Sequence, residues 1–358
     1  MNILVDMTVL ELPPTGVANV LTGLYGAVAR LYPGIRVSGV HRRALGGHLP
    51  RGIGARRLCR ALPPGAWRAL ALPYASSRSR GAVLHFPWNG GVPRLPAGTR
   101  VVTTLHDVLP LSIPGYFRSD RNEKMYRMER QRDTERSTVI VTDSEYSKSE
   151  ILRHLRPPQE PVVIPCATTI GTYAVDVAPG PAPYFLYVGG IDARKSLDTL
   201  LDVFCRLRRE ESLRATLVVA GSSRHAPPAL SAQLREAVAA GHAQATGYVD
   251  DRELARLYAG ALALVYPSRY EGFGMPPLEA MTLGCPVIAA RASSIPEVCA
   301  DAALYIEPWS PLGIAEAIRR IADDARLRAR LKREGTARAA QFSWEKAADT
   351  FVRLLEKL

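Results

Sequence analysis

The chain has 358 residues, of which 47% are hydrophobic and 22% charged, and this predicts a globular protein of two domains. No uninterrupted apolar run approaches the ~20 residues that span a bilayer. The five scattered cysteines contain no C-x-x-C pair, so they indicate neither a disulfide framework nor a zinc site. The first residues, MNILVDMTVLEL, lack the basic segment of a signal peptide, and we expect a buried strand there and a cytoplasmic protein.

The net charge of +12 lies almost entirely in the first half of the chain. Residues 1–175 hold 23 of the 46 basic residues but only 12 of the 34 acidic ones. Between Leu12 and His106 there are 13 arginines and no Asp or Glu. This excess predicts an acidic partner, which is an anionic membrane, an anionic acceptor or nucleic acid. Nucleic acid is the weakest of the three, because no known nucleic-acid-binding motif occurs.

Strand-like and helical segments alternate through the first half. The expected strands are Ile3–Asp6, Ile35–Val40, Val83–Phe86, Val101–Leu105, Val139–Thr142 and Val162–Pro165. Gly16 lies between the first strand and an apolar-periodic helix, where its backbone could approach a ligand. His106 directly follows a strand, at the sheet edge where ligands of α/β proteins bind.

Residues 42–80 carry nine arginines, interleaved with Trp67 and several leucines. One interpretation is a solvated helical face whose apolar side packs on the core. The other is an interfacial segment that contacts an anionic membrane, with Trp67 as an anchor near the headgroups. The sequence leaves both open.

Residues 169–183 are rich in Gly and Pro without periodicity, which predicts a linker. We therefore expect a first domain over residues 1–168 and a second over 184–342, with a separate helix at 343–358. Expected strands of the second domain are Tyr184–Val188, Leu217–Ala220, Ala261–Val265, Val287–Ala290 and Ala303–Ile306. Their alternation with helices predicts a doubly wound parallel sheet in each domain.

The stretch from Tyr266 to Glu279, YPSRYEGFGMPPLE, joins a strand, a glycine turn and a helix N-terminus. Backbone amides near Gly272, Phe273 and Gly274 would face an anion there, helped by the helix dipole. Two carboxylates, Glu271 and Glu279, flank this turn.

A second loop, Gly189–Lys195, follows the first strand of the second domain. It places Arg194 and Lys195 directly before a helix. No Asp-x-Asp metal-binding pair occurs in the sequence. A guanidinium fork and a mobile ammonium could instead neutralise a leaving phosphate.

The motif and its flanks, YAGALALVYPS before and EAMTLGCPVIAARASSIPEV after, resemble the E-x7-E signature of retaining nucleotide-sugar glycosyltransferases of family 4. Gly189-Gly190 together with Arg194 and Lys195 resembles that family's G-x-x-x-x-R-K loop. The resemblance implies a GT-B fold, in which two Rossmann-like doubly wound domains face a cleft and the C-terminal helix crosses back to the first domain.

The resemblance also implies roles for the site residues. Gly190, Arg194 and Lys195 would grip the diphosphate, Glu279 the ribose, and Glu271 and His106 the donor sugar.

The implied reaction is metal-independent transfer, with retention, of a hexose (mannose favoured) from a GDP- or UDP-linked donor to a glycan or glycolipid. It would serve surface polysaccharide or lipopolysaccharide biosynthesis at the inner face of the cytoplasmic membrane. The alternatives are a GT-B-like nucleotide-sugar epimerase and, less favoured, a basic nucleic-acid-binding protein without enzymatic activity.

Overall fold

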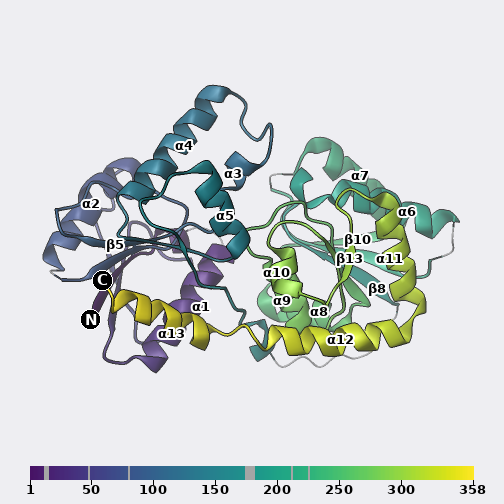
Figure 1. The fold of residues 1–358 in the computed structure, drawn as a ribbon. Coiled ribbons are helices and arrows are strands. Elements are labelled where there is room, and N and C mark those ends of the chain that lie inside the picture. Colours follow the sequence, from purple (N-terminus) through teal and green to yellow (C-terminus); the bar gives the residue numbers. More distant parts are fainter. Residues whose placement is uncertain (12–15, 47–48, 80, 174–181, 211–212, 225) are drawn as a thin grey trace. The chain divides into compact units, whose positions relative to one another are not determined.

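The computed structural model describes the whole chain except residues 12–15, 47–48, 80, 174–181, 211–212 and 225. The chain forms two compact units, Met1–Ala167 with Ser343–Leu358, and Thr168–Phe342. Each unit contains a parallel sheet with helices on its faces, which confirms the expected fold class (Figure 1). Of the expected linker 169–183, residues 174–181 lie outside the described residues, and the segment before them belongs to the second unit.

The described part of the first unit contains a seven-stranded sheet in the order β3-β2-β1-β4-β5-β6-β7, with every pair parallel. Its strands are β1 Asn2–Asp6, β2 Arg36–His41, β3 Gly54–Arg57, β4 Val83–Phe86, β5 Arg100–Thr104, β6 Val139–Thr142 and β7 Val162–Val163. Its helices are α1 Gly16–Leu31, α2 Pro64–Arg78, α3 Leu109–Ser112, α4 Asp120–Glu135, α5 Glu145–His154 and α13 Trp344–Leu355, with a 3-10 turn at Thr8–Glu11.

Helix α2 corrects one expectation for the arginine-rich segment. Trp67 is 1% exposed and packs with Leu4 and Phe86 in the core. Its indole Nε1–H donates to the Leu58 carbonyl at 2.7 Å. The expectation that Trp67 anchors the protein among lipid headgroups is therefore wrong, because this face of α2 lies on the sheet.

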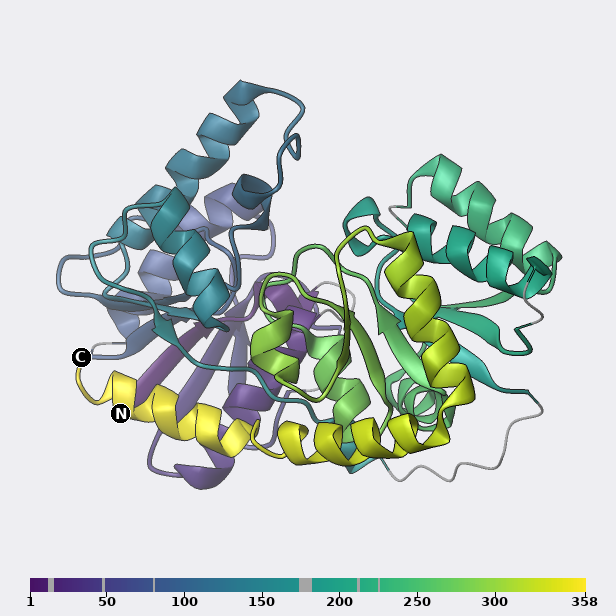
Figure 2. The ribbon, with the colours of Figure 1, turned by 45° about the vertical axis from the view of Figure 1, so that its right-hand side comes forward.

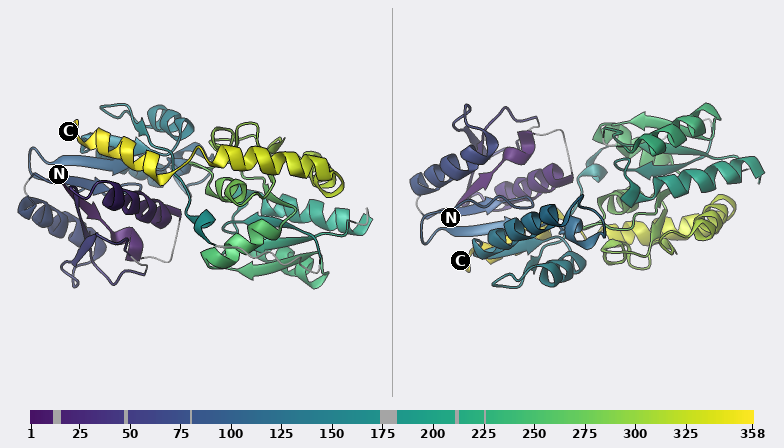
Figure 3. Two further views of the ribbon diagram at one scale, coloured as in Figure 1. Left: turned by 90° about the horizontal axis from the view of Figure 1, so that it is seen from below. Right: turned by 90° about the horizontal axis from the view of Figure 1, so that it is seen from above.

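The last helix, α13, belongs to the first unit, although α12 before it belongs to the second (Figure 2). It begins after Ser343, whose hydroxyl accepts from the Lys346 amide, and it lies beside α1 (Figure 3). Gly23 of α1 leaves the space that the Trp344 indole occupies. The chain thus returns to the first unit at its C-terminal end.

In the second unit the described residues form a six-stranded parallel sheet in the order β10-β9-β8-β11-β12-β13. Its strands are β8 Tyr184–Val188, β9 Thr216–Ala220, β10 Ala243–Gly247, β11 Ala263–Tyr266, β12 Val287–Ala290 and β13 Leu304–Ile306. Its helices are α6 Leu197–Glu210, α7 Pro228–Ala239, α8 Asp251–Gly260, α9 Met275–Thr282, α10 Ile295–Cys299, α11 Pro311–Asp323 and α12 Ala325–Ala339, with 3-10 turns at Ile170–Thr172 and Ala193–Lys195.

Helices α6, α7 and α11 pack through one large apolar cluster on one face of the second sheet. Helices α8 and α9 contact strands β8, β11 and β12. The sheet is therefore doubly wound. Among the described residues, none of the helices combines the length and apolar character needed to cross a bilayer.

Candidate active site

The two motifs of the second unit meet where the strand order reverses. Strands β8 and β11 are neighbours, and the chain proceeds from β8 toward β9 on one side and from β11 toward β12 on the other. Ligands of open α/β sheets bind at such a switch point, beyond the carboxyl ends of the strands. The Gly189–Lys195 loop follows β8 and the glycine turn follows β11, so both lie at this point.

Glu271 is the centre of the site. Its Oε1 lies 2.8 Å from Nη1 of Arg194 and 3.4 Å from Nζ of Lys195. The Ser268 hydroxyl donates to the same oxygen at 2.6 Å. The structure thus brings together three of the four residues expected to be catalytic.

Burial alone would raise the pKa of Glu271, but Lys195, Arg194 and the Ser268 and Tyr266 hydroxyls outweigh it and hold the pKa at about 2. Burial would likewise lower the pKa of Arg194, and Glu271 and Asp192 raise it instead. Glu271 and Arg194 are therefore both charged at neutral pH. Asp192 Oδ2 also lies 3.5 Å from Arg194 Nη2, so two carboxylates and two basic side chains meet here.

Neighbouring polar groups fix this cluster in place. Lys195 Nζ donates to the Tyr266 hydroxyl at 3.1 Å, and the ammonium lies 5.0 Å from the centre of that ring. Arg194 Nη1 also donates to the Tyr270 carbonyl at 2.6 Å. The Ser293 hydroxyl accepts from the Glu271 amide at 2.9 Å. Each charged side chain is thus positioned from a second direction.

Two glycines permit the close approach of the β8 and β9 loops. Gly189 has φ +143°, and a Cβ there would lie 2.6 Å from Lys195 Nζ. A Cβ on Gly221 would overlap the Gly189 carbonyl. Gly190 differs, since a Cβ there would meet nothing nearer than Asp192 Oδ2 at 3.8 Å. Its expected part in binding stays a prediction.

The turn before α9 is fixed by hydrogen bonds from a residue outside the turn. The Ser294 hydroxyl donates to the carbonyls of Glu271 at 2.9 Å and Phe273 at 2.7 Å. The Phe273 ring is 6% exposed and packs edge-on against Phe342, so only its backbone could face a ligand. Gly274, with φ +120°, directly precedes α9. Anion binding by Gly272, Phe273 and Gly274 stays a prediction.

Glu279 lies one turn into α9 and is 9% exposed. Its Oε2 accepts from the Tyr258 hydroxyl at 2.9 Å. Burial raises the pKa of Glu279 to about 7, because the Tyr258 hydrogen bond offsets only part of the desolvation. This carboxyl group therefore titrates near neutral pH, unlike Glu271.

A cavity of about 530 Å³ adjoins the β8 loop. It is lined by Ile191, Val219, Gly221, Ser223, Ser231, Leu234, Arg235, Val238, Ala239, Ala245 and Gly247. Most of these side chains are apolar, and Ile191 and Gly221 come from the loops that follow β8 and β9. This cavity can accept a flat apolar group next to the charged cluster.

His106 follows β5 in the first unit and is 7% exposed. Its Nδ1 lies 2.7 Å from Asp143 Oδ2 and its Nε2 lies 3.1 Å from the Pro87 carbonyl. Burial would lower its pKa, but Asp143 and the Pro87 carbonyl raise it to about 9. The imidazolium thus donates both ring N–H groups within its own unit, and its expected contact with a donor sugar stays a prediction.

Gly16 is the exposed first residue of α1. A Cβ there would meet nothing within 4 Å. The local fold therefore does not require glycine at this position, and the expected approach of a ligand stays a prediction.

Several residues that position the site had no predicted role. Tyr266 and Ser268 lie within the motif, and Ser293 and Ser294 lie in its C-terminal flank. Tyr258, the partner of Glu279, opens the N-terminal flank. A polar residue directly after a buried strand is the signal that could have found Ser268 and Ser293.

Comparison with known proteins agrees with this geometry. Residues 174–338 match the model of the family described as "Glycosyl transferases group 1". An O-antigen chain mannosyltransferase B from Escherichia coli is 34% identical over 261 residues, which cover 69% of this chain and 67% of that protein.

Two solved structures share the fold over nearly the whole chain. Sucrose-phosphate synthase from Thermosynechococcus elongatus aligns with a TM-score of 0.78 at 21% identity, covering 99% of this chain and 98% of that one. WaaG, a glycosyltransferase involved in lipopolysaccharide biosynthesis, aligns with a TM-score of 0.76 at 16% identity, covering 99% of both chains. The strand order, the charged cluster at the switch point and these similarities lead to one conclusion: the chain is a glycosyltransferase and belongs to the glycosyl transferases group 1 family.

Proposed function

We propose that the chain is a retaining, metal-independent hexosyltransferase that moves mannose from a nucleoside-diphosphate sugar to a glycan or glycolipid acceptor. The observation that carries this proposal is the convergence of Arg194 and Lys195 on Glu271 at the switch point. Two cations converge there on the Glu271 carboxylate, and the more exposed Asp192 carboxylate lies 3.5 Å from Arg194.

Breaking the bond between sugar and diphosphate leaves negative charge on the terminal phosphate. Preorganised donors in a partly buried site stabilise such charge more strongly than water does. Arg194 offers a planar fork and Lys195 three rotatable N–H donors. These two side chains would perform the task that a divalent metal performs in other transferases.

The remaining residues would each bind a different part of the donor. Glu271 would accept sugar hydroxyls, and Glu279 the two ribose hydroxyls. The apolar cavity beside Ile191 would take the base. His106, from the other unit, would bind the sugar only if it gave up its bond to the Pro87 carbonyl.

Retention in glycosidases uses a free carboxylate as nucleophile. Glu271 is bound to two cations, which lowers its nucleophilicity. We therefore favour attack of the acceptor on the same face that the phosphate leaves, with the phosphate taking the acceptor's proton.

The choice of mannose is supported by the name of the Escherichia coli relative, an O-antigen chain mannosyltransferase. An acceptor in lipopolysaccharide or surface-polysaccharide assembly would be lipid-linked at the inner face of the cytoplasmic membrane. The basic first half of the chain suits peripheral contact with such an anionic surface. A cytoplasmic location is part of the proposal.

The test is a panel of UDP-, GDP- and dTDP-sugars scored by thermal shift, since a ligand raises stability by RT ln(1 + [L]/Kd). We expect stabilisation by GDP-mannose above the other donors. Product analysis by NMR then reports the anomeric configuration, and an inverted product contradicts the proposal. Conversion of the sugar without acceptor would instead indicate an epimerase.

A further inference from the structure

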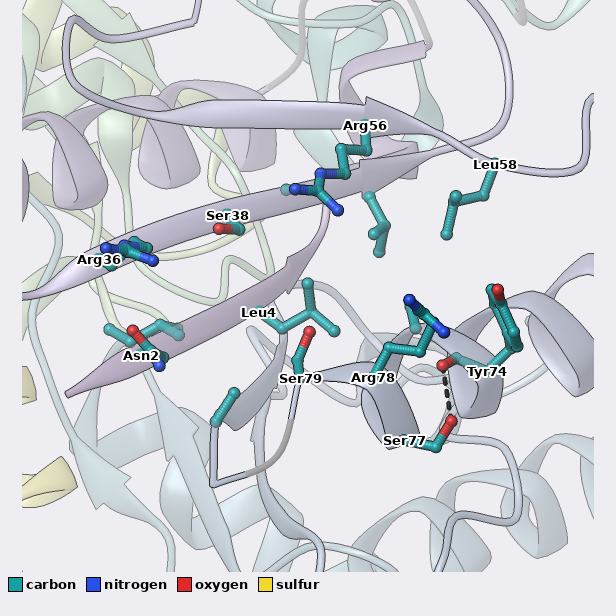
Figure 4. Close-up of a pocket in the computed structure, with 15 residues that line it drawn as sticks. Asn2, Leu4, Arg36, Ser38, Arg56, Leu58, Tyr74, Ser77, Arg78 and Ser79 are labelled. Carbon is teal, nitrogen blue, oxygen red and sulfur yellow. Dashed lines mark hydrogen bonds between the residues drawn. The ribbon is translucent and has the colours of Figure 1, made fainter.

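The first unit contains a larger cavity, of about 850 Å³, on the α2 face of its sheet (Figure 4). It lies over strands β1, β2 and β3 beside the C-terminal end of α2. Its polar lining residues are Asn2, Arg36, Ser38, Arg56, Tyr74, Ser77, Arg78 and Ser79. Ligands of open α/β sheets bind beyond the carboxyl ends of the strands. This cavity opens on a sheet face and is separate from that edge.

Part of this sheet face is polar, whereas the faces of a parallel sheet are normally apolar and covered by helices. Leu4 of β1 and Val40 of β2 belong to the apolar cluster under α2. Two residues earlier on the same side of each strand stand Asn2 and Ser38. The sheet thus changes from apolar to polar within one cavity, which leaves room for a charged ligand.

Three arginines surround this cavity without a carboxylate. Arg36, Arg56 and Arg78 line it together, and none of the described lining residues is Asp or Glu. Within the described residues, no ion pair or side-chain hydrogen bond of these three is found. By contrast, Arg42 nearby reaches Glu11. The Arg78 guanidinium lies 6.0 Å from the centre of the Tyr74 ring, a contact that leaves its charge unneutralised. Three guanidinium groups of this kind with serine hydroxyls between them form a suitable receptor for phosphate oxygens.

Helix α2 carries two exposed apolar side chains on the side of the cavity, and one of them, Tyr74, lines it. Leu70 is 61% and Tyr74 56% exposed. Together with Arg78 they recur every fourth residue, so they form one stripe along α2. Apolar side chains beside arginines are typical of surfaces that lie at the boundary between lipid headgroups and acyl chains.

We propose that the cavity of Arg36, Arg56 and Arg78 binds the phosphate groups of an anionic phospholipid bilayer, with Leu70 and Tyr74 inserted beside them. The inference rests on the proposed function in one respect, because a lipid-linked acceptor gives the protein a reason to meet the bilayer. It identifies a defined site within the basic half of the chain. Leu70 and Tyr74 take the anchor role that was expected for Trp67.

The experiment is vesicle flotation of the full chain with phosphatidylglycerol–phosphatidylcholine and with pure phosphatidylcholine vesicles. The variant is Arg36→Gln/Arg56→Gln/Arg78→Gln. The control is Arg94→Gln/Arg118→Gln/Arg121→Gln, which removes the same charge from three other exposed arginines of the first unit. Since each basic residue near such a surface contributes about fivefold, we expect the cavity variant to bind anionic vesicles on the order of 100-fold more weakly.

The control should lose no more than roughly tenfold, because its charges act only at a distance. Equal losses of vesicle binding in both triple variants would mean that the whole basic surface attracts the bilayer, and this would overturn the proposed site. Equal binding of wild type to both vesicle types would overturn it too. Leu70→Ser/Tyr74→Ser should weaken vesicle binding with all arginines kept, and unchanged binding contradicts the insertion of these side chains.

A second arm separates the lipid from a soluble anion. Inorganic phosphate and diphosphate are added at constant ionic strength, and thermal unfolding is followed. If they stabilise the wild type but not the cavity variant, while vesicles bind neither, the cavity is a soluble-phosphate site and the lipid assignment is wrong. Thermal shift by nucleotide sugars, recorded in parallel, tests the second unit alone, so failure of the proposed function is distinguished from failure of the lipid site.

Discussion

The two units share one architecture but differ in net charge and in how their buried charged side chains are arranged. The first half of the chain carries nearly all of the net charge of +12. Its buried His106, however, is paired with Asp143 of the same unit. The second unit, in the nearly neutral half, places two cations around Glu271.

The comparison shows that overall charge is a poor guide to an anion-binding active site. Charges on an exposed surface are screened by salt within about 8–10 Å. Charges in a partly buried site act at a lower dielectric and keep their strength. The anion-binding site that we propose therefore lies in the second unit, although most of the net charge lies in the first half of the chain.

The largest effect should come from removing either cation of the second unit. Arg194→Ala or Lys195→Ala should lower transfer by roughly 10²-fold or more, because each is proposed to stabilise leaving-group charge. The control is Arg256→Ala, an exposed arginine of α8 that pairs with Glu253. Initial rates with saturating donor measure this.

A chelator provides the complementary test. Activity should survive EDTA, since the two cations replace a metal in the proposed mechanism. Loss of activity with EDTA, followed by recovery with Mn²⁺, would refute metal independence.

Substitution of the two glutamates should affect the binding of free nucleotide and of the intact donor differently. Glu279→Ala should weaken binding of free UDP or GDP by roughly 10- to 150-fold, the range for hydrogen bonds to a charged group. Glu271→Ala should leave free nucleotide almost unaffected and damage binding or turnover of the intact donor. Calorimetry with nucleotide and with nucleotide sugar compares them. The same loss of nucleotide affinity in both variants would contradict the assigned roles.

The two charged clusters should respond to pH in opposite directions. The pKa of Glu271 is about 2, below its ordinary 4.5, so its stabilisation is present above pH 4.5 and is lost as the pH falls through 2. The pKa of His106 is about 9, above its ordinary 6.5, so its stabilisation is complete below pH 6.5 and is lost as the pH rises through 9. Each amounts to roughly 3 kcal/mol of unfolding free energy.

Hydrogen exchange, read separately for peptides of each unit, measures this difference. Glu271→Gln should destabilise the second unit at pH 7 and much less at pH 3. His106→Asn should destabilise the first unit at pH 6 and much less at pH 10. A constant destabilisation across pH in either variant would contradict the ionic origin of that unit's stability.

The smallest effect should come from Gly16. Gly16→Ala should leave stability of the first unit unchanged or slightly higher, by less than about 1 kcal/mol, because a Cβ there has free space. A fall in transfer without a change in stability would indicate that a ligand approaches this backbone. Gly221→Ala is the counterpart, because its Cβ would overlap Gly189 and should disturb donor binding.

Most of the fold follows from local sequence. The buried strands Tyr184–Val188 and Val287–Ala290 are found where predicted, since continuous apolar runs between turn residues allow little else. Two edge strands, Gly54–Arg57 and Ala243–Gly247, were not predicted. Four of the five residues of the latter are exposed, so it has almost no hydrophobic signal.

The fold class, the motif from Tyr266 to Glu279 and the cations of the β8 loop could all be predicted from the sequence. These depend on residue types at fixed local spacing, which a strand, a glycine turn and a helix start dictate.

How these segments contact one another could be seen only in the three-dimensional fold. It paired Arg194 and Lys195 with Glu271, enclosed His106 within its own unit, buried Trp67 and left Leu70 and Tyr74 exposed. Such outcomes depend on which strands become neighbours and which helix face meets the sheet. Those contacts join residues far apart in the chain, and local spacing cannot fix them.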